Sequence, residues 1–132
     1  MIHPSSLLRR ALQADALVSG AMALLLVIGA ATLAPLLTLP QPLLFQTGLF
    51  LIAYAAFVGW LGTRSSLLRP LVLLVIVGNA AWTLASIALL ISGAVAPNGL
   101  GLAFVVMQAV VVGVFAELQY VGLKRSGAAL AA

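Results

Sequence analysis

Residues 71–91 read LVLLVIVGNAAWTLASIALLI, an apolar stretch without a single charged side chain. A helix of about 20 such residues crosses the roughly 30 Å hydrocarbon layer of a membrane. A strand of a membrane barrel would instead show about ten residues in which apolar and polar side chains alternate. This stretch therefore predicts a transmembrane helix and an all-α fold.

Three further stretches share this apolar character. The predicted spans are residues 16–36, 43–62, 71–91 and 100–123. Because the connections between them are short, successive helices are expected to be neighbours that run in opposite directions. We predict one domain over residues 1–132, an antiparallel four-transmembrane-helix bundle in a polytopic membrane protein.

The composition agrees with this interpretation, since 64% of the 132 residues are hydrophobic and 6% are charged. A soluble domain has about 25% charged residues, so the lipid bilayer is the expected partner of the exterior. The chain has no cysteine, which excludes disulfides and thiolate metal sites. The single histidine, His3, lies outside the spans, which argues against an embedded haem. We expect no cofactor and no metal.

All six basic residues lie on one side of the predicted spans. Two precede the first span, two lie between the second and third spans, and two follow the fourth. In this order they are Arg9, Arg10, Arg64, Arg69, Lys124 and Arg125. The opposite connections, residues 38–42 and 93–98, carry no charge. Because basic residues of short loops stay in the cytoplasm, we predict that both termini are cytoplasmic. The basic residues come in pairs beside spans and form no clustered patch, so nucleic acid is not an expected partner.

The first span has a second interpretation, a cleaved signal peptide that begins with Arg9 and Arg10 and ends near Ala34. Its apolar run exceeds the roughly 7–15 residues of a signal peptide, and Pro35 would follow the cut, so we expect a retained helix. Pro35 is expected to lie in the first outer turn, because proline is poorly tolerated inside helices. Residues 126–132 are expected to fray.

Asp15 and Glu117 are the only acidic residues. Along a helix, Asp15 lies roughly 7 Å from Arg10, and Glu117 roughly 10 Å from Lys124, so both have a similar depth. An ionisable residue inside a membrane span is a functional hypothesis in its own right. Two interpretations stay open. The two carboxylates meet in one polar pocket between the first and last helices, or each pairs with a neighbouring basic side chain.

Tyr54 and Asn79 are both roughly 15 Å from the basic boundary and are expected to meet between the second and third helices. Asn79, Thr83 and Ser86 follow one another at helical spacing and form a polar stripe, with Trp82 beside it. This face is expected to look inward. It either makes hydrogen bonds between helices or lines a cavity for a small polar or aromatic ligand.

Polar residues occupy two faces of the fourth span. Gln108 and Gln119 are only about 20° apart around the helix axis, whereas Glu117 lies about 180° from Gln108. An amide or carboxyl group that faces lipid is costly. We therefore expect both faces to contact protein, either inside the bundle or across an oligomer interface, and a homo-oligomer or a larger membrane complex is an expected partner.

The order of elements resembles the small bacterial four-helix inner-membrane proteins grouped as DoxX-like, and FAELQY at residues 115–120 looks like the closing segment of an uncharacterised set of them. This resemblance implies the bacterial inner membrane and no particular activity. The size is also similar to that of small multidrug-resistance transporters, which exchange substrates for protons at a glutamate deep in the first helix. Here that helix has only Asp15, near its end, and the charge bias is strong. Both departures count against the match.

Three functions are compatible with these residues. The first is a non-enzymatic accessory or interaction subunit, because one histidine, two carboxylates and no cysteine do not assemble a catalytic site. The second is a small proton- or cation-coupled transporter or channel, in which the two carboxylates bind the ion and Tyr54, Asn79 and Gln108 line the path. The third is a membrane binding protein for a quinone-like or lipid ligand near Tyr54, Asn79 and Trp82.

Overall fold

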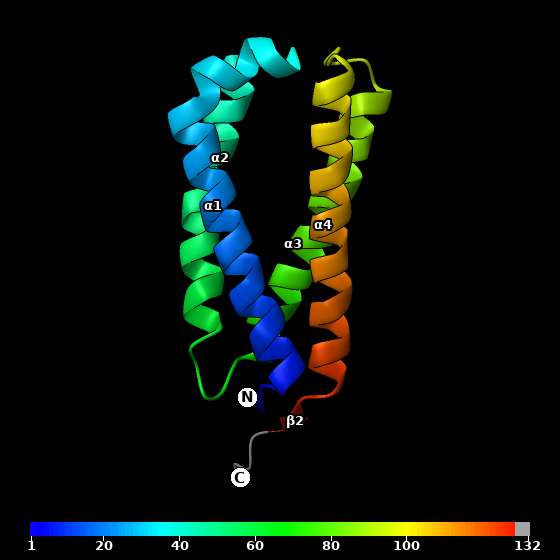
Figure 1. Ribbon diagram of the computed structural model, residues 1–132. Coiled ribbons are helices and arrows are strands. Elements are labelled where there is room, and N and C mark those ends of the chain that lie inside the picture. The colour runs from blue at the N-terminus through cyan, green and yellow to red at the C-terminus, as the bar shows by residue number, and fades with distance from the viewer. Residues whose placement is uncertain (129–132) are drawn as a thin grey trace.

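The computed structural model describes residues 1–128 (Figure 1). Its helices and strands are β1 (Ile2–His3), α1 (Ser6–Leu37), α2 (Gln41–Leu61), α3 (Arg69–Ile91), α4 (Gly99–Lys124) and β2 (Gly127–Ala128). All four of these helices are long and apolar enough to cross a membrane. The prediction of an all-helical chain with four candidate spans is confirmed, and it indicates a multi-pass membrane protein.

α1 is longer than the predicted first span at its start. The hydroxyl of Ser5 caps it by accepting a hydrogen bond from the backbone N–H of Leu8. Pro35, which we expected in the turn, lies inside the last turn of α1. A proline there removes only one helical hydrogen bond. The helix ends instead at Thr38, which adopts a left-handed conformation with φ of 55° and returns its N–H to the carbonyl of Ala34.

The helices pack as two pairs. α1 packs against α2, α3 packs against α4, and α1 also contacts α4, whereas the backbones of α2 and α3 hardly approach each other. Glycines permit the closest approaches. A Cβ at Gly122 of α4 would lie 2.7 Å from the backbone of Leu8, and one at Gly48 of α2 would lie 2.8 Å from the Val27 side chain. The two pairs are therefore in direct contact through α1 and α4.

Both ends of the described chain lie at the same end of the molecule (Figure 1). There β1 pairs with β2, and Ile2 exchanges two backbone hydrogen bonds of 2.8 Å with Leu67 in the α2–α3 connection. We name this arrangement of β1, β2 and Leu67 the terminal clasp. The expectation of fraying is wrong for residues 126–128, which take part in ordered contacts. Residues 129–132 lie outside the described residues.

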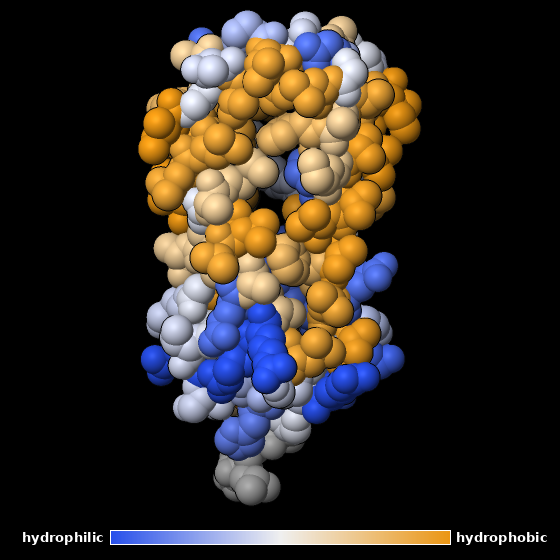
Figure 2. Space-filling view, viewed as in Figure 1, coloured by the Kyte–Doolittle hydropathy of each residue, from blue (hydrophilic) through white to orange (hydrophobic). Residues whose placement is uncertain are grey.

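Two apolar clusters fill the ends of the molecule. The cluster beside the terminal clasp consists of Ile2, Leu8, Leu12, Val58, Leu61, Leu67, Val72, Val75 and Leu123. The cluster at the opposite end consists of Leu26, Ala30, Leu37, Leu39, Leu44 and Val105. The surface between the two ends is largely hydrophobic, and hydrophilic residues gather toward the end with the termini (Figure 2). The middle of the molecule is occupied by a polar cluster and a cavity.

Candidate functional site

Asp15 is the centre of a polar cluster to which all four helices contribute. Its carboxylate is buried, with 2% of the residue exposed. Oδ1 accepts a hydrogen bond of 3.0 Å from Ser19 Oγ on the same helix. Oδ2 is 2.7 Å from Tyr54 Oη of α2, 3.0 Å from Asn79 Nδ2 of α3 and 2.8 Å from Gln119 Nε2 of α4. We name these five residues the Asp15 cluster.

The cluster is also connected internally. Tyr54 Oη lies 2.8 Å from Asn79 Oδ1, and Asn79 Nδ2 donates a second hydrogen bond of 2.9 Å to Gln119 Oε1. Asn79 and Gln119 are 5% and 0% exposed. In the described part of the chain, no buried side-chain nitrogen or oxygen lacks a hydrogen-bond partner. Polar side chains thus join the two helix pairs where the backbones of α2 and α3 remain apart.

All four hydrogen-bonding partners of the Asp15 carboxylate are neutral groups. Arg9, one of the basic residues considered as an ion-pair partner, donates instead to the carbonyl oxygen of Gly62 at 3.3 Å. Gln13 donates to the same carbonyl at 3.0 Å. The Asp15 carboxyl group therefore makes its hydrogen bonds with uncharged groups, and it is satisfied as a buried polar group requires.

Glu117 does not join Asp15. Its side chain is exposed on α4, while Gln119, two residues further on, occupies the place beside Asp15. Two residues along a helix are about 200° apart around its axis, so only one of the two side chains faces inward. The two carboxylates have a similar depth but lie on different faces of the fold.

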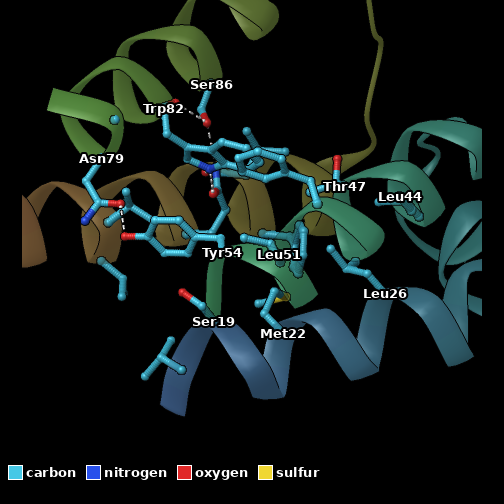
Figure 3. A pocket seen from close by; sticks show the side chains of 18 of the residues that line it. Ser19, Met22, Leu26, Leu44, Thr47, Leu51, Tyr54, Asn79, Trp82 and Ser86 are labelled. Atoms are coloured by element: carbon cyan, nitrogen blue, oxygen red, sulfur yellow. Dashed lines mark hydrogen bonds between the residues drawn. The ribbon is translucent and has the colours of Figure 1, made fainter. Parts of the chain in front are cut away.

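A cavity of about 610 Å³ lies between the two helix pairs and extends from the Asp15 cluster toward the apolar cluster at the uncharged end. Ser19, Tyr54 and Asn79 border it, so the cavity and the Asp15 cluster share a wall (Figure 3). Figure 2 shows the surface hollowed between α1 and α4 at this level. Lining residues with exposed side chains include Met107 of α4 and Phe50 of α2, which indicates that the cavity opens to the surroundings at the depth of the apolar belt.

A second polar group forms the wall of the cavity on α3 and α4. Trp82 Nε1 donates to Gln108 Oε1 at 2.9 Å, and Gln108 Nε2 donates to Ser86 Oγ at 3.0 Å and to the Val105 carbonyl at 2.8 Å. Ser86 Oγ donates to the Trp82 carbonyl at 2.8 Å. The predicted polar stripe of the third helix therefore looks inward, and it combines both expected roles. It makes interhelical hydrogen bonds and borders the cavity.

Stacked aromatic rings cross the gap between α2 and α3. The ring of Phe50 is stacked on that of Trp82 with centroids 5.7 Å apart, and on that of Tyr54 with centroids 6.4 Å apart. These separations fall in the range of favourable aromatic pairs. The two helices thus meet through rings on one side of the cavity.

Most N–H and O–H groups of the polar side chains around the cavity already donate hydrogen bonds within the protein. Every N–H and O–H proton of Ser19, Tyr54, Asn79, Trp82, Ser86 and Gln108 is accounted for by an internal hydrogen bond. Thr47 is the exception among the described lining residues. The free capacity of this wall consists of oxygen lone pairs. A ligand in the cavity is therefore expected to bind more tightly if it donates hydrogen bonds than if it only accepts them.

Of the site residues expected from the sequence, Asp15, Tyr54 and Asn79 are brought together, Trp82 and Gln108 form the neighbouring wall, and Glu117 lies apart. Ser19 and Gln119 were not among them. Ser19 follows Asp15 by one helical turn, and Gln119 shares a face with Gln108, so both had a spacing signal. Within residues 1–128, no three histidine, aspartate or glutamate side chains lie close enough together to hold a metal ion.

No family model matches the chain, and no significant match is found among curated proteins or solved structures. The resemblance to DoxX-like proteins stays a prediction.

Proposed function

We propose that the protein is a membrane binding protein for a lipid-soluble ligand that carries a hydroxyl group on a flat ring. The observation that carries this proposal is the cavity, whose walls are apolar and aromatic except for polar side chains that, apart from Thr47, offer only lone pairs. Its volume of about 610 Å³ suits a drug-sized molecule, since ligand cavities typically measure about 300–1,000 Å³.

The ring is inferred from the stacked side chains of Phe50, Tyr54 and Trp82 beside the cavity. A planar ligand extends such a stack at favourable distances. The hydroxyl group is inferred from the lone pairs of Ser19 Oγ and Gln108 Oε1, which have acceptor capacity left. A hydroquinone has both features. The corresponding quinone has the ring but only accepts hydrogen bonds.

The proposal includes the way the chain sits in the membrane. We propose an antiparallel up-down bundle with both termini in the cytoplasm, in the bacterial inner membrane. The orientation is supported by the six basic residues, which occur only at the starts or ends of helices and connections on the side of the termini. The bacterial assignment rests on the resemblance stated above. The opening of the cavity between α1 and α4 lies at the depth of the apolar belt and admits a ligand directly from the bilayer.

We further propose that the protein carries out no catalysis of its own. A homo-oligomer or larger membrane complex stays a prediction. It is supported by Glu117, which is exposed on α4 beside exposed apolar side chains such as Val114 and Leu118. A carboxyl group in such surroundings is less costly when a partner covers it. The mass of the protein extracted in a mild detergent measures whether it is a monomer.

The ligand proposal is tested with a matched pair of probes, a short-tailed benzohydroquinone and the benzoquinone with the same ring and tail. Binding to the purified protein in lipid nanodiscs is measured by titration calorimetry, with the hydroquinone kept reduced under anaerobic conditions. We expect the hydroquinone to bind about tenfold more tightly, a difference of about 1.4 kcal/mol, because it donates hydrogen bonds to a wall whose polar side chains, apart from Thr47, have only lone pairs free. Equal affinities would contradict the inferred hydroxyl group.

The location of the ligand is tested by filling the cavity. Gly78 lines it, and a Cβ at this position meets no atom within 4 Å, so Gly78→Leu is expected to fold and to occupy ligand space. Gly99→Leu is the matched control, since a Cβ there is equally unhindered and Gly99 does not line the cavity. We expect binding to be lost in the first variant and kept in the second. Unchanged binding in Gly78→Leu would place the ligand elsewhere.

A further inference from the structure

The hydroxyl oxygen of Tyr54 lies within hydrogen-bonding distance of two acceptor oxygens, although it has only one proton to donate. Tyr54 Oη is 2.7 Å from Asp15 Oδ2 and 2.8 Å from Asn79 Oδ1, and both of these atoms are acceptors. The hydroxyl group of tyrosine has one proton to donate. If Asp15 is ionised, one of the two contacts joins two oxygen atoms with no proton directed between them.

Reorienting the amides does not remove this difficulty. In the observed orientation Asn79 Nδ2 donates to Asp15 Oδ2 and to Gln119 Oε1, and Gln119 Nε2 also donates to Asp15 Oδ2. Turning the Asn79 amide alone brings its oxygen against two other oxygens. Turning both amides surrounds Asp15 Oδ2 with two amide oxygens and removes both N–H donors from it. The observed orientation is therefore the one that the hydrogen bonds require.

We propose that Asp15 is a neutral carboxylic acid and that the Asp15 cluster is a membrane-buried proton-binding site. With a proton on Asp15 Oδ2, this atom donates to Tyr54 Oη, and Tyr54 donates in turn to Asn79 Oδ1. The two amide N–H groups donate to the lone pairs of Asp15 Oδ2, and Ser19 donates to Oδ1. Every contact in the cluster then has one proton.

The surroundings of the carboxyl group favour the same state. α2 presents one titratable group to it, the phenol of Tyr54, and α3 and α4 present the neutral amides of Asn79 and Gln119. On α1, Arg9 is bonded to a backbone carbonyl, and Arg10 is exposed. A buried charge without a counter-ion is strongly disfavoured at this depth. Protonation removes that charge.

Tyr54 connects the proton to the cavity, because its side chain borders the cavity (Figure 3) and its hydroxyl group also contacts Asp15. A proton leaves in two coupled steps. The O–H group of Tyr54 turns from Asn79 Oδ1 toward the cavity and its proton passes to a water molecule or a basic ligand atom there, while the Asp15 O–H bond breaks as a new O–H bond forms on Tyr54. The Tyr54–Asn79 contact then has no proton until the site is protonated again. Asp15 keeps the negative charge and accepts a hydrogen bond from Tyr54, so no electron is transferred. The site is independent of the identity of the ligand proposed above.

The composition makes a direct test feasible, because the chain contains a single aspartate and a single glutamate. Cell-free synthesis with aspartate that carries ¹³C at its side-chain carboxyl carbon therefore marks Asp15 alone, and the same labelling of glutamate marks Glu117 alone. Infrared spectra of the intact protein in lipid vesicles at neutral pH distinguish the C=O stretch of a carboxylic acid from the stretches of a carboxylate. No substitution is needed, so the cluster is measured undisturbed.

We expect the aspartate label to shift a carboxylic-acid C=O band to lower frequency. The glutamate label is the matched control and is expected to leave that band unchanged. Tyr54→Phe removes the acceptor of the Asp15 proton and is expected to raise the frequency of the same band. The proposal is overturned if the aspartate label shifts only carboxylate bands at neutral pH, or if the Asp15 acid band is the same in Tyr54→Phe as in the parent protein.

Discussion

Neutral hydrogen-bonding groups surround the Asp15 carboxyl group, and each helix supplies at least one of the polar side chains involved. Gln119 has a special place among them, because it is fully buried and bonds both Asp15 and Asn79. In a membrane protein, a hydrogen bond between helices contributes about 0.6 kcal/mol on average. Leaving buried partners without a hydrogen bond costs more, about 1–3 kcal/mol.

Gln119→Leu keeps the approximate volume and removes both hydrogen bonds of this side chain. We expect it to lower the free energy of unfolding in detergent by about 1–3 kcal/mol, because Asp15 and Asn79 lose their partner in a buried place. Gln46→Leu is the control, since Gln46 is exposed on α2. Equal stabilities of the two variants would show that Gln119 contributes little to the cluster.

Part of this site was predictable from spacing alone. The rise of a helix determines depth, so the meeting of Tyr54 and Asn79 followed from their equal distances to flanking basic residues. Depth did not distinguish Glu117 from Gln119, which lie within one turn of each other. Both faces of the fourth helix carry polar groups, and the choice between them depends on where α1 packs. That packing is a tertiary property.

At the scale of helices, continuous apolar runs predicted the existence of all four helices, because hydropathy reports what crosses a bilayer. The start of α1 was not predicted, since the polar side chains of Arg9, Arg10 and Asp15 lower the hydropathy of residues 6–15. A helix continues beyond the apolar belt wherever its backbone bonds and its cap are satisfied. The Ser5 cap was the local signal for this start.

Close helix packing depends on particular glycines. In α4, a Cβ at Gly122 would lie 2.7 Å from the Leu8 backbone, whereas a Cβ at Gly113 would lie 3.5 Å from Thr83 Oγ1. Both Gly→Ala substitutions raise helix propensity by about 1 kcal/mol. We expect Gly113→Ala to be neutral or stabilising, and Gly122→Ala to destabilise by about 1–3 kcal/mol because α1 and α4 are forced apart. Thermal unfolding in detergent compares the pair. A Gly122→Ala variant as stable as Gly113→Ala would contradict tight α1–α4 packing.

At the scale of the molecule, the cavity results from unequal pairing of the helices. α1 contacts two neighbours, while α2 and α3 meet mainly through aromatic and polar side chains. The sequence does not reveal this, because all four apolar runs are similar in length and character. The existence of a polar inward face on α3 was predictable, but the empty space beside it was not.

The proposed orientation makes a prediction for the whole protein in cells. Because the chain has no cysteine, a single introduced thiol reports one position. Ser92 and Ser65 are both exposed, in the α3–α4 and α2–α3 connections. In intact cells with a permeable outer membrane, an impermeant maleimide is expected to label Ser92→Cys and to label Ser65→Cys only after lysis. The reverse pattern would mean that the termini face outward.

The terminal clasp has a consequence for biosynthesis. It joins Ile2 to Ala128, and the Asp15 cluster likewise joins the first helix to the last. The ribosome makes the chain from its N-terminus at about 5–20 residues per second, so α1 emerges well before Gln119 exists. During that interval Asp15 lacks its partners on α2, α3 and α4. Residence of α1 near the insertion machinery until α4 arrives would spare the nascent chain an unsatisfied acid in lipid.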